Sequence, residues 1–130
     1  MRVMVVGGCG YIGSVLVPKL LHAGHEVTVI DLMWFGNFLK PHRALTILRA
    51  DIRDNIALDG FDAIIHLAGV ANDPCCELDA KLSWEINALA TMRLADNAAR
   101  CGVKHFIYAS SGSVYGIKGN TEVTEEEPCV

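Results

Sequence analysis

The sequence predicts a doubly wound parallel α/β sheet, and three observations support this fold class. Five short apolar runs have the length of buried strands, and the segments that separate them include two with a helical pattern. A glycine-rich segment, residues 7–13, stands between the first run and the first helix. A carboxylate, Asp31, ends the second run. Right-handed crossovers between parallel strands then give the strand order 3-2-1-4-5, with both faces of the sheet covered.

The first strand is expected at residues 2–6 and the first helix at residues 11–23. Pro18 falls inside this helix and is expected to distort its second turn, because proline lacks the backbone N–H. Gly24 follows the last turn, where helices commonly end. The apolar side chains expected along one face of this helix are Ile12, Val15, Leu16 and Leu20.

A second, long helix is expected at residues 78–100, where apolar side chains recur at three- and four-residue spacing. Gly102 follows its end. A simple turn is expected at residues 72–74, and residues 118–130 show no strand or helix period, so we expect a loop there. The remaining strands are expected at residues 26–30, 45–49, 63–67 and 104–109.

Composition narrows the class of protein. The chain has 130 residues with a net charge of −4 and shows no basic stripe, which argues against a nucleic-acid partner. No apolar run is long enough to span a bilayer, and the first residues resemble a strand more than a signal peptide. The 5 cysteines include no Cys-x-x-Cys pair, so we expect reduced thiols, a cytoplasmic protein and no metal site.

Three glycines, Gly7, Gly10 and Gly13, are spaced for a phosphate-binding turn. A strand that turns sharply into a helix favours residues without a Cβ atom, and so does close approach of the backbone to a pyrophosphate. The unpaired N–H groups at the start of a helix attract anions. A tight turn with no ligand would use the same residues, but the position between a strand and a helix favours a dinucleotide site.

Asp31 supports the same interpretation. A carboxylate at the end of the second strand can accept hydrogen bonds from both ribose hydroxyls of adenosine. It would repel a 2′-phosphate, so the sequence favours NAD over NADP. The alternative is an exposed aspartate in an ordinary turn.

At this point the sequence resembles the extended short-chain dehydrogenase/reductase family, which contains nucleotide-sugar epimerases and dehydratases. The resemblance extends over essentially all 130 residues. It rests on five blocks that occur in the family's order: the glycine turn 7–13 with its Tyr11-Ile12 pair, residues 51–54, residues 66–69, Asn87, and residues 109–116.

The resemblance implies a Rossmann-type fold that binds NAD, a nucleotide-sugar substrate and a homodimeric parent protein. It places Asp51 and Ile52 on the adenine. Asn87 would stabilise the central sheet and an active-site water. Asp51 could instead be a solvated helix cap. Asn87 could instead belong to a structural hydrogen-bond network, because a buried amide needs partners. The resemblance also implies that Leu67, Ala68 and Gly69 form a wall of small residues along the cofactor. Simple tight packing is the alternative for these residues.

Ser111 is the candidate catalytic residue, because the resemblance places a Ser or Thr hydroxyl there against the reacting sugar oxygen. A hydroxyl both donates and accepts hydrogen bonds, although an ordinary loop serine is the alternative. The family's Tyr-x-x-x-Lys motif, in which the lysine lowers the phenol pKa, does not occur in this sequence. The chain stops just before that motif is due, so we expect an incomplete domain, residues 1–130, that is inactive alone.

The sequence therefore predicts the cofactor-binding part of an NAD-dependent nucleotide-sugar epimerase or dehydratase that works through a transient keto-sugar. The alternatives are a non-catalytic NAD(P)-binding regulator or assembly subunit, and an NAD-dependent keto-sugar reductase. Two features depart from the family. Residues 32–39 are unusually apolar and would pack either on the adenine or on other parts of the protein. Ala71 stands where some sugar epimerases have a lysine that reaches the cofactor.

Overall fold

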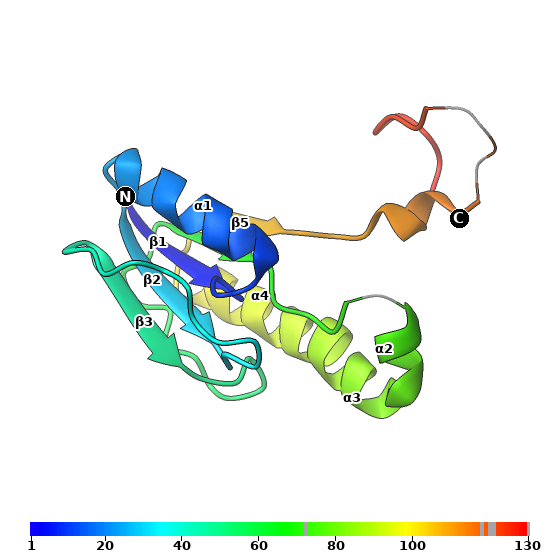
Figure 1. The fold of residues 1–130 in the computed structure, drawn as a ribbon, viewed down its shortest axis with the longest axis horizontal. Helices are drawn as coiled ribbons and strands as arrows, with labels where there is room; N and C mark the ends of the chain where they lie inside the picture. The colour runs from blue at the N-terminus through cyan, green and yellow to red at the C-terminus, as the bar shows by residue number, and fades with distance from the viewer. Residues whose placement is uncertain (72, 118, 120–121, 130) are drawn as a thin grey trace.

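The computed structural model describes residues 1–71, 73–117, 119 and 122–129. Its centre is a five-stranded sheet in which every neighbouring pair is parallel (Figure 1). The strand order β3-β2-β1-β4-β5 confirms the predicted order. The strands are β1 (Arg2–Val6), β2 (Glu26–Asp31), β3 (Leu45–Arg49), β4 (Ala63–His66) and β5 (His105–Tyr108).

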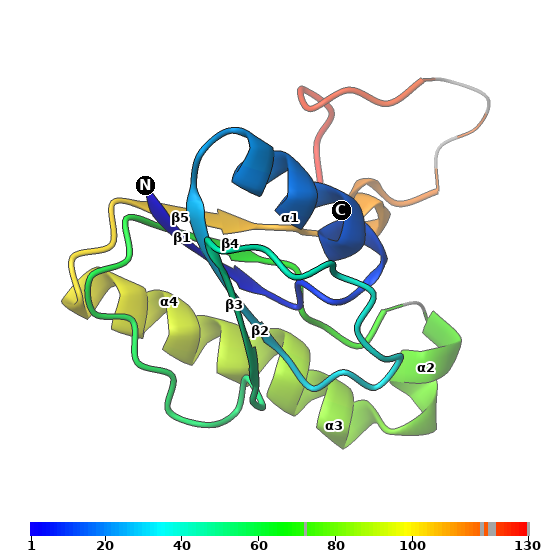
Figure 2. The same ribbon diagram turned by 60° about the vertical axis from the view of Figure 1, so that its left-hand side comes forward.

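Helices cover both faces of the sheet, as predicted for a doubly wound fold. The helix α1 (Tyr11–His22) lies on one face, and a long helix lies on the other (Figure 2). The long helix passes without a break through α3 (Ala80–Trp84), the π-helical η1 (Glu85–Ala90) and α4 (Thr91–Arg100). Two short elements complete the described chain, α2 (Asp73–Leu78) and the 3₁₀ helix η2 (Gly112–Tyr115).

The central strand β1 supplies side chains to both halves of the core. Val3 and Val5 belong to the cluster on the α1 side, and Met4 and Val6 belong to the cluster that includes the long helix. Successive side chains of a strand point to opposite faces, so a continuous apolar run is what a doubly covered strand requires. The apolar run at the start of the chain therefore fixes β1 in the middle of the sheet.

The buried face of α1 agrees with the prediction at Leu20, which packs against the core, but differs from it nearer the start of the helix. Gly13 and Val17 are the buried residues of this helix, whereas Ile12 and Val15 are 58% and 55% exposed. The helix contacts the glycine turn through Gly13 itself, and this close contact turns Ile12 and Val15 outward. The helix continues through Pro18 to His22, and its end agrees with the predicted stop, because Gly24 follows with a φ of +83°.

The start of the long helix also differs from the prediction. Helix α3 begins after Asp79, whose side-chain Oδ1 accepts a hydrogen bond from the backbone N–H of Leu82 at 2.9 Å. This N-cap separates α3 from α2, so Leu78 belongs to α2 rather than to the long helix. The predicted turn at 72–74 is wrong for Asp73 and Pro74, which begin α2, and Asn72 lies outside the described residues.

Beyond β5 the chain leaves the body of the domain. The strand leads to η2, and the described residues 122–129 lie apart from the sheet and its helices (Figures 1 and 2). The described residues of the segment 118–130 contain no helix or strand, as the sequence predicted. In the part of the chain that the structure describes, no helix combines the length and the apolar character that a membrane span requires.

One polar side chain, His66, is fully buried in the core at the end of β4. Its Nε2 lies 2.8 Å from Oγ1 of Thr91, and its buried Nδ1 has no hydrogen-bond partner among the described residues. The rings of Phe106 and Tyr108 lie beside the imidazole. Burial lowers the pKa of His66 to about 4, because the charged imidazolium would lose its hydration there.

We expect His66 to make the domain less stable in mild acid. The unfolded chain takes up a proton on this histidine near its ordinary pKa of 6.5, but the folded chain does so only near 4. The free energy of unfolding should therefore be unaffected by His66 above pH 6.5 and should fall by roughly 3 kcal/mol as the pH drops from 6.5 to about 4. Urea unfolding at a series of pH values measures the effect.

Two variants separate His66 from the other titrating groups. His66→Gln should flatten the pH dependence, whereas His105→Gln, a change at an exposed histidine, should leave it intact. An NMR titration that finds the folded His66 ring protonating near 6.5 would contradict the account, whether or not the glutamine variant folds.

Candidate functional site

A cleft of about 150 Å³ lies at the carboxyl ends of the strands. It spans the point where the chain order in the sheet reverses, between β1 and β4, which is where open α/β sheets bind ligands. The cleft is lined by Val6, Gly7, Gly10, Ile30, Asp31, Leu32, Trp34, Phe35, Ala50, Asp51, Ile52, Leu67, Ala68, Gly69, Val70 and Ile86.

Gly7 joins three strands at the rim of this cleft. It leaves β1 with a φ of +82°, and its N–H donates to the carbonyl of Ile30 at the end of β2 at 2.7 Å. A Cβ atom at this position would lie 2.5 Å from the backbone nitrogen of Ala68, just beyond β4. Both the backbone conformation and the close contact therefore require glycine.

Gly13 and Gly10 serve different purposes. A Cβ atom on Gly13 would lie 2.5 Å from the Cα atom of Gly8, so the first turn of α1 packs directly on the glycine turn. A Cβ atom on Gly10 would meet only the carbonyl oxygen of Gly7, at an ordinary 3.4 Å, and the φ of Gly10 is −75°. Nothing within the described protein excludes a side chain at Gly10, but a side chain there would occupy the cleft.

The start of α1 favours an anion. Its N-cap, Gly10, supplies no side-chain acceptor, and the first turn contains no acidic residue. The backbone N–H groups of Tyr11, Ile12 and Gly13 have no acceptor within the helix, and the helix dipole adds partial positive charge at this end. The side chains of Tyr11 and Ile12 are exposed and do not line the cleft, so only their backbone groups can contribute to it. This is the arrangement that binds phosphate groups.

Asp31 links the glycine turn to the loop after β2. Its Oδ2 accepts a hydrogen bond from the N–H of Cys9 at 2.9 Å, and its Oδ1 accepts one from the N–H of Met33 at 2.7 Å. Each carboxylate oxygen can accept more than one hydrogen bond, so capacity for a ligand remains. Burial, together with the Asp31 charge, raises the pKa of the Cys9 thiol, which keeps the thiol neutral beside the cleft.

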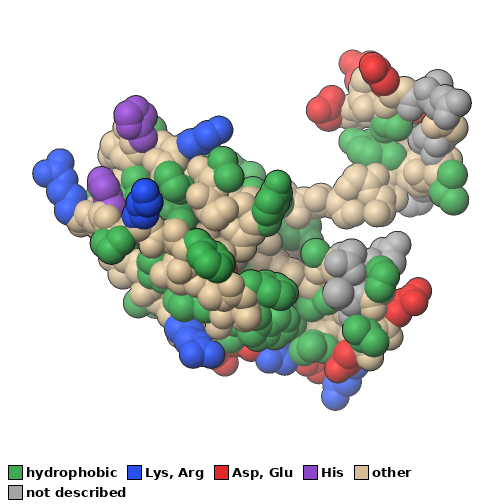
Figure 3. Space-filling view, in the orientation of Figure 1, with side chains coloured by type: hydrophobic (Ala, Val, Ile, Leu, Met, Phe, Trp, Pro, Cys, Tyr) green, Lys and Arg blue, Asp and Glu red, His purple; other side chains and the backbone are tan. Residues whose placement is uncertain are grey.

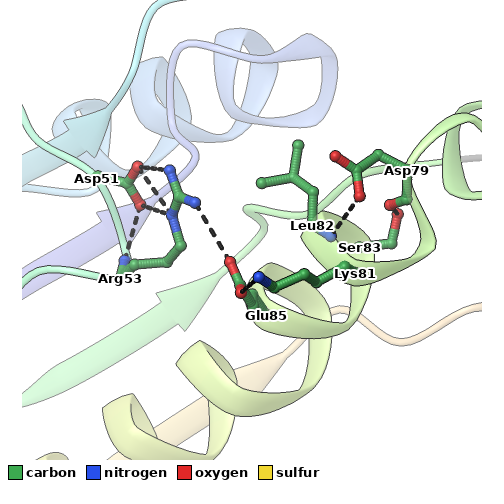
Figure 4. A network of polar contacts seen from close by, with 7 residues as sticks. All are labelled: Asp51, Arg53, Asp79, Lys81, Leu82, Ser83 and Glu85. Atoms are coloured by element: carbon green, nitrogen blue, oxygen red, sulfur yellow. Dashed lines mark hydrogen bonds and ion pairs between the residues drawn. The ribbon is translucent and has the colours of Figure 1, made fainter.

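Asp51 is held by Arg53 in a network that reaches the long helix (Figure 4). The Arg53 Nη2 lies 2.6 Å from Oδ2 of Asp51, and the backbone N–H of Arg53 donates to Oδ1 at 2.8 Å. These hydrogen bonds lower the pKa of the Asp51 carboxyl. The Arg53 Nη1 also lies 3.6 Å from Oε2 of Glu85 in η1.

Asn87 holds in place the loop after β4, which lines one side of the cleft. The Val70 N–H donates to Oδ1 of Asn87 at 2.8 Å, and Nδ2 of Asn87 donates to the Val70 carbonyl at 2.9 Å. A Cβ atom on Gly69 would lie 3.0 Å from Oδ1 of Asn87, so this loop lies close against η1. Asn87 does not line the cleft, and the structure gives its amide the role of holding the loop that does.

Ser111 lies outside this cleft. It is exposed at the N-cap of η2, where its Oγ accepts a hydrogen bond from the N–H of Ser113 at 3.1 Å. Among the described residues, no group of three or more His, Cys, Asp or Glu side chains could hold a metal ion. The predicted site residues that the structure does bring together in the cleft are Gly7, Gly10, Asp31, Asp51, Ile52, Leu67, Ala68 and Gly69.

Sequence reasoning missed one feature of this site and left a second open between two alternatives. Arg53 was part of the block 51–54 but carried no assigned role, although an arginine two residues after a cleft aspartate is a usable signal. Trp34 and Phe35 line the cleft, and the apolar character of residues 32–39 had left their position open. Both features depend on how loops meet, which local patterns do not specify.

A positive helix end, a carboxylate at the end of β2 and an apolar cleft at the reversal of strand order define a dinucleotide-binding domain. The chain belongs to the NAD dependent epimerase/dehydratase family, whose sequence model matches residues 3–130.

Related proteins agree with this assignment. A UDP-glucose 4-epimerase from Neisseria meningitidis serogroup B is 31% identical over 140 residues, covering 98% of this chain and 41% of the relative. The UDP-glucose 4-epimerase of Thermus thermophilus, solved in complex with NAD, has a TM-score of 0.86 at 29% identity, covering 100% of this chain and 44% of that protein.

A dTDP-glucose 4,6-dehydratase from Streptomyces venezuelae, solved with NAD bound, has a TM-score of 0.88 at 29% identity. The match covers 100% of this chain and 45% of the dehydratase chain. The chain thus spans less than half the length of the relatives that it matches.

We expect alanine at Gly7 to destabilise the fold more than alanine at Gly24. Both glycines have a φ above +80°, which costs an L-residue about 1–2 kcal/mol. A Cβ atom at Gly24 meets nothing within 4 Å, whereas one at Gly7 meets the Ala68 backbone. Gly7→Ala should therefore lose about 1–3 kcal/mol more in urea unfolding. Equal losses in the two variants would show that the contact between Gly7 and Ala68 does not constrain the fold.

Proposed function

We propose that this chain binds NAD in the cleft and is the cofactor-binding part of a nucleotide-sugar epimerase or dehydratase. The observation that carries the proposal is the start of α1, where the N-cap Gly10 lines the cleft without a side chain and the first N–H groups of the helix have no acceptor within it. Relatives described as epimerases and a dehydratase support the same reaction class.

The residues of the cleft fit the parts of NAD. The diphosphate would lie against the backbone at Gly10, Tyr11, Ile12 and Gly13. The Asp31 carboxylate, already oriented by the N–H groups of Cys9 and Met33, would accept hydrogen bonds from the ribose hydroxyls. The same carboxylate would repel a 2′-phosphate, which favours NAD over NADP. Asp51 and Ile52 would lie beside the adenine.

The wall after β4 would serve the other half of the cofactor. The residues Leu67, Ala68 and Gly69 present backbone and small side chains to the cleft, and Asn87 holds the loop in place through Val70. Bound NAD would accept and return a hydride at a sugar carbon, by way of a transient keto-sugar. These residues would position the nicotinamide ring of NAD and limit its movement.

Ser111 would hold the reacting sugar oxygen, because its hydroxyl can donate to a ketone and accept from an alcohol. It follows β5, at the same edge of the sheet as the cleft. The base that would take the hydroxyl proton is a tyrosine of a Tyr-x-x-x-Lys pair in the related family, and these 130 residues contain no such pair.

We therefore expect these 130 residues alone to bind NAD without turning over substrate. Incubation with NAD and UDP-glucose or dTDP-glucose, followed by chromatography of the sugar nucleotides, should recover both unchanged. Formation of a new sugar nucleotide would show that the chain contains its own catalytic base.

Alanine at Gly10 tests the proposed cofactor site. The Cβ atom fits the folded protein at a φ of −75° but occupies the cleft, so the variant should fold normally and bind NAD at least about tenfold more weakly. Isothermal titration calorimetry measures the affinity. Gly24→Ala is the matched control, because it is strained but far from the cleft lining and should keep the wild-type affinity. Unchanged affinity in Gly10→Ala would sink the proposal.

A further inference from the structure

The loop after β2 carries two exposed aromatic side chains on a tight turn. The Gly36 N–H donates to the carbonyl of Met33 at 3.0 Å, which closes a turn with Trp34 and Phe35 at its middle positions. We call residues 33–36 the aromatic turn. Trp34 is 60% exposed and Phe35 is 85% exposed. In the space-filling view, hydrophobic side chains are exposed across the middle of the face that Figure 3 shows.

The aromatic turn is anchored to the cofactor site. The N–H of Met33 donates to Oδ1 of Asp31 at 2.7 Å, and Met33 has a φ of +58°. Among the residues that the structure describes, it is the only non-glycine with a positive φ. This conformation is unfavourable for an L-residue, and it persists because the hydrogen bond to Asp31 holds it. The carboxylate that faces the cleft therefore also sets the position of the aromatic turn.

Trp34 and Phe35 both line the cleft, on the side where β2 and β3 end. The other residues that line the cleft include the apolar Ile30 and Ile52 and the acidic Asp31 and Asp51. Within the described part of the chain, neither ring has an aromatic partner or a cation above it. A large π face without a partner, at the rim of a narrow apolar cleft, suits a flat ring better than a phosphate or a sugar.

We propose that Trp34 stacks on the purine base of the bound dinucleotide and holds its adenosine half in the cleft. The proposal rests on the proposed function, which places the adenosine half beside Asp31 and Asp51. Trp34 follows the strand that ends in Asp31, whereas the opposite wall belongs to the loop after β4. Of the two rings, Trp34 is the larger and the less exposed, so it offers the larger face for stacking and is the more firmly held.

The tryptophan content of the chain allows a direct test. The sequence has 2 tryptophans, Trp34 and Trp84. Trp84 ends α3, is also exposed at 61%, and does not line the cleft. In Trp84→Phe, Trp34 is the sole tryptophan, and both NAD and AMP should change its emission when it is excited at wavelengths that tyrosine does not absorb. In Trp34→Phe the remaining emission should not respond to AMP.

Affinity provides the second readout. Trp34→Ala should weaken binding of NAD and of AMP by about tenfold in calorimetry, with binding of nicotinamide mononucleotide unchanged. Trp84→Ala is the matched control and should bind all three ligands as the wild type does. Because Trp34 is exposed, circular dichroism of Trp34→Ala should match that of the wild type.

The outcomes distinguish this proposal from the one on which it rests. If the wild-type chain gives no heat with NAD, the proposed function fails, and the stacking proposal fails with it. If NAD binds but Trp34→Ala binds NAD and AMP as tightly as Trp84→Ala does, only the stacking proposal is overturned. Unchanged Trp34 emission in Trp84→Phe saturated with NAD would likewise overturn the stacking proposal alone.

Discussion

The contact between Gly7 and the backbone of Ala68 is the constraint on which the rest of the site depends. Here β1 ends, the N–H of Gly7 donates to the carbonyl of Ile30 in β2, and a Cβ atom at Gly7 would collide with the Ala68 backbone just beyond β4. This contact fixes the direction in which the chain leaves the sheet. Gly13 then packs on Gly8, and α1 begins directly after Gly10, which lines the cleft.

Asp31 connects this turn to the opposite rim. One carboxylate oxygen orients Cys9 in the glycine turn and the other orients Met33 in the aromatic turn. A residue predicted from sequence as a ligand for ribose is therefore also a structural acceptor for the chain's own backbone. The two roles are compatible because a carboxylate accepts several hydrogen bonds. In an amide at this position, an NH2 group would replace one of the two oxygens. Because an NH2 group cannot accept a hydrogen bond, either the glycine turn or the aromatic turn would lose its contact with residue 31.

The sheet was predictable because its signals are local. A buried parallel strand needs a continuous apolar run, and the run at Arg2–Val6 packs on both faces, as this pattern requires. The order of strands followed from the handedness of crossovers. The face of α1 was mispredicted, because apolar periodicity treats Ile12 and Val15 as core residues and cannot register that a glycine, Gly13, makes the closest contact.

Much of the cleft lining was likewise predictable, but the residues that hold the lining in place were not. The residues Gly7, Gly10 and Asp31 stand at fixed points of a strand-turn-helix-strand unit, so their spacing alone brings them together. The Arg53 bridge from Asp51 to Glu85 and the hold of Asn87 on Val70 join segments that are far apart in the sequence. Both depend on where η1 crosses behind the sheet, which no pattern in the sequence specifies.

The central claim is that backbone N–H groups at the start of α1 receive the diphosphate of NAD. The most direct measurement is an amide NMR titration of the isotope-labelled chain with NAD. The account predicts that the largest shifts occur at the N–H groups of Tyr11, Ile12 and Gly13, together with those of the glycine turn. Saturation with NAD that leaves these amides unmoved, while others shift, would contradict it.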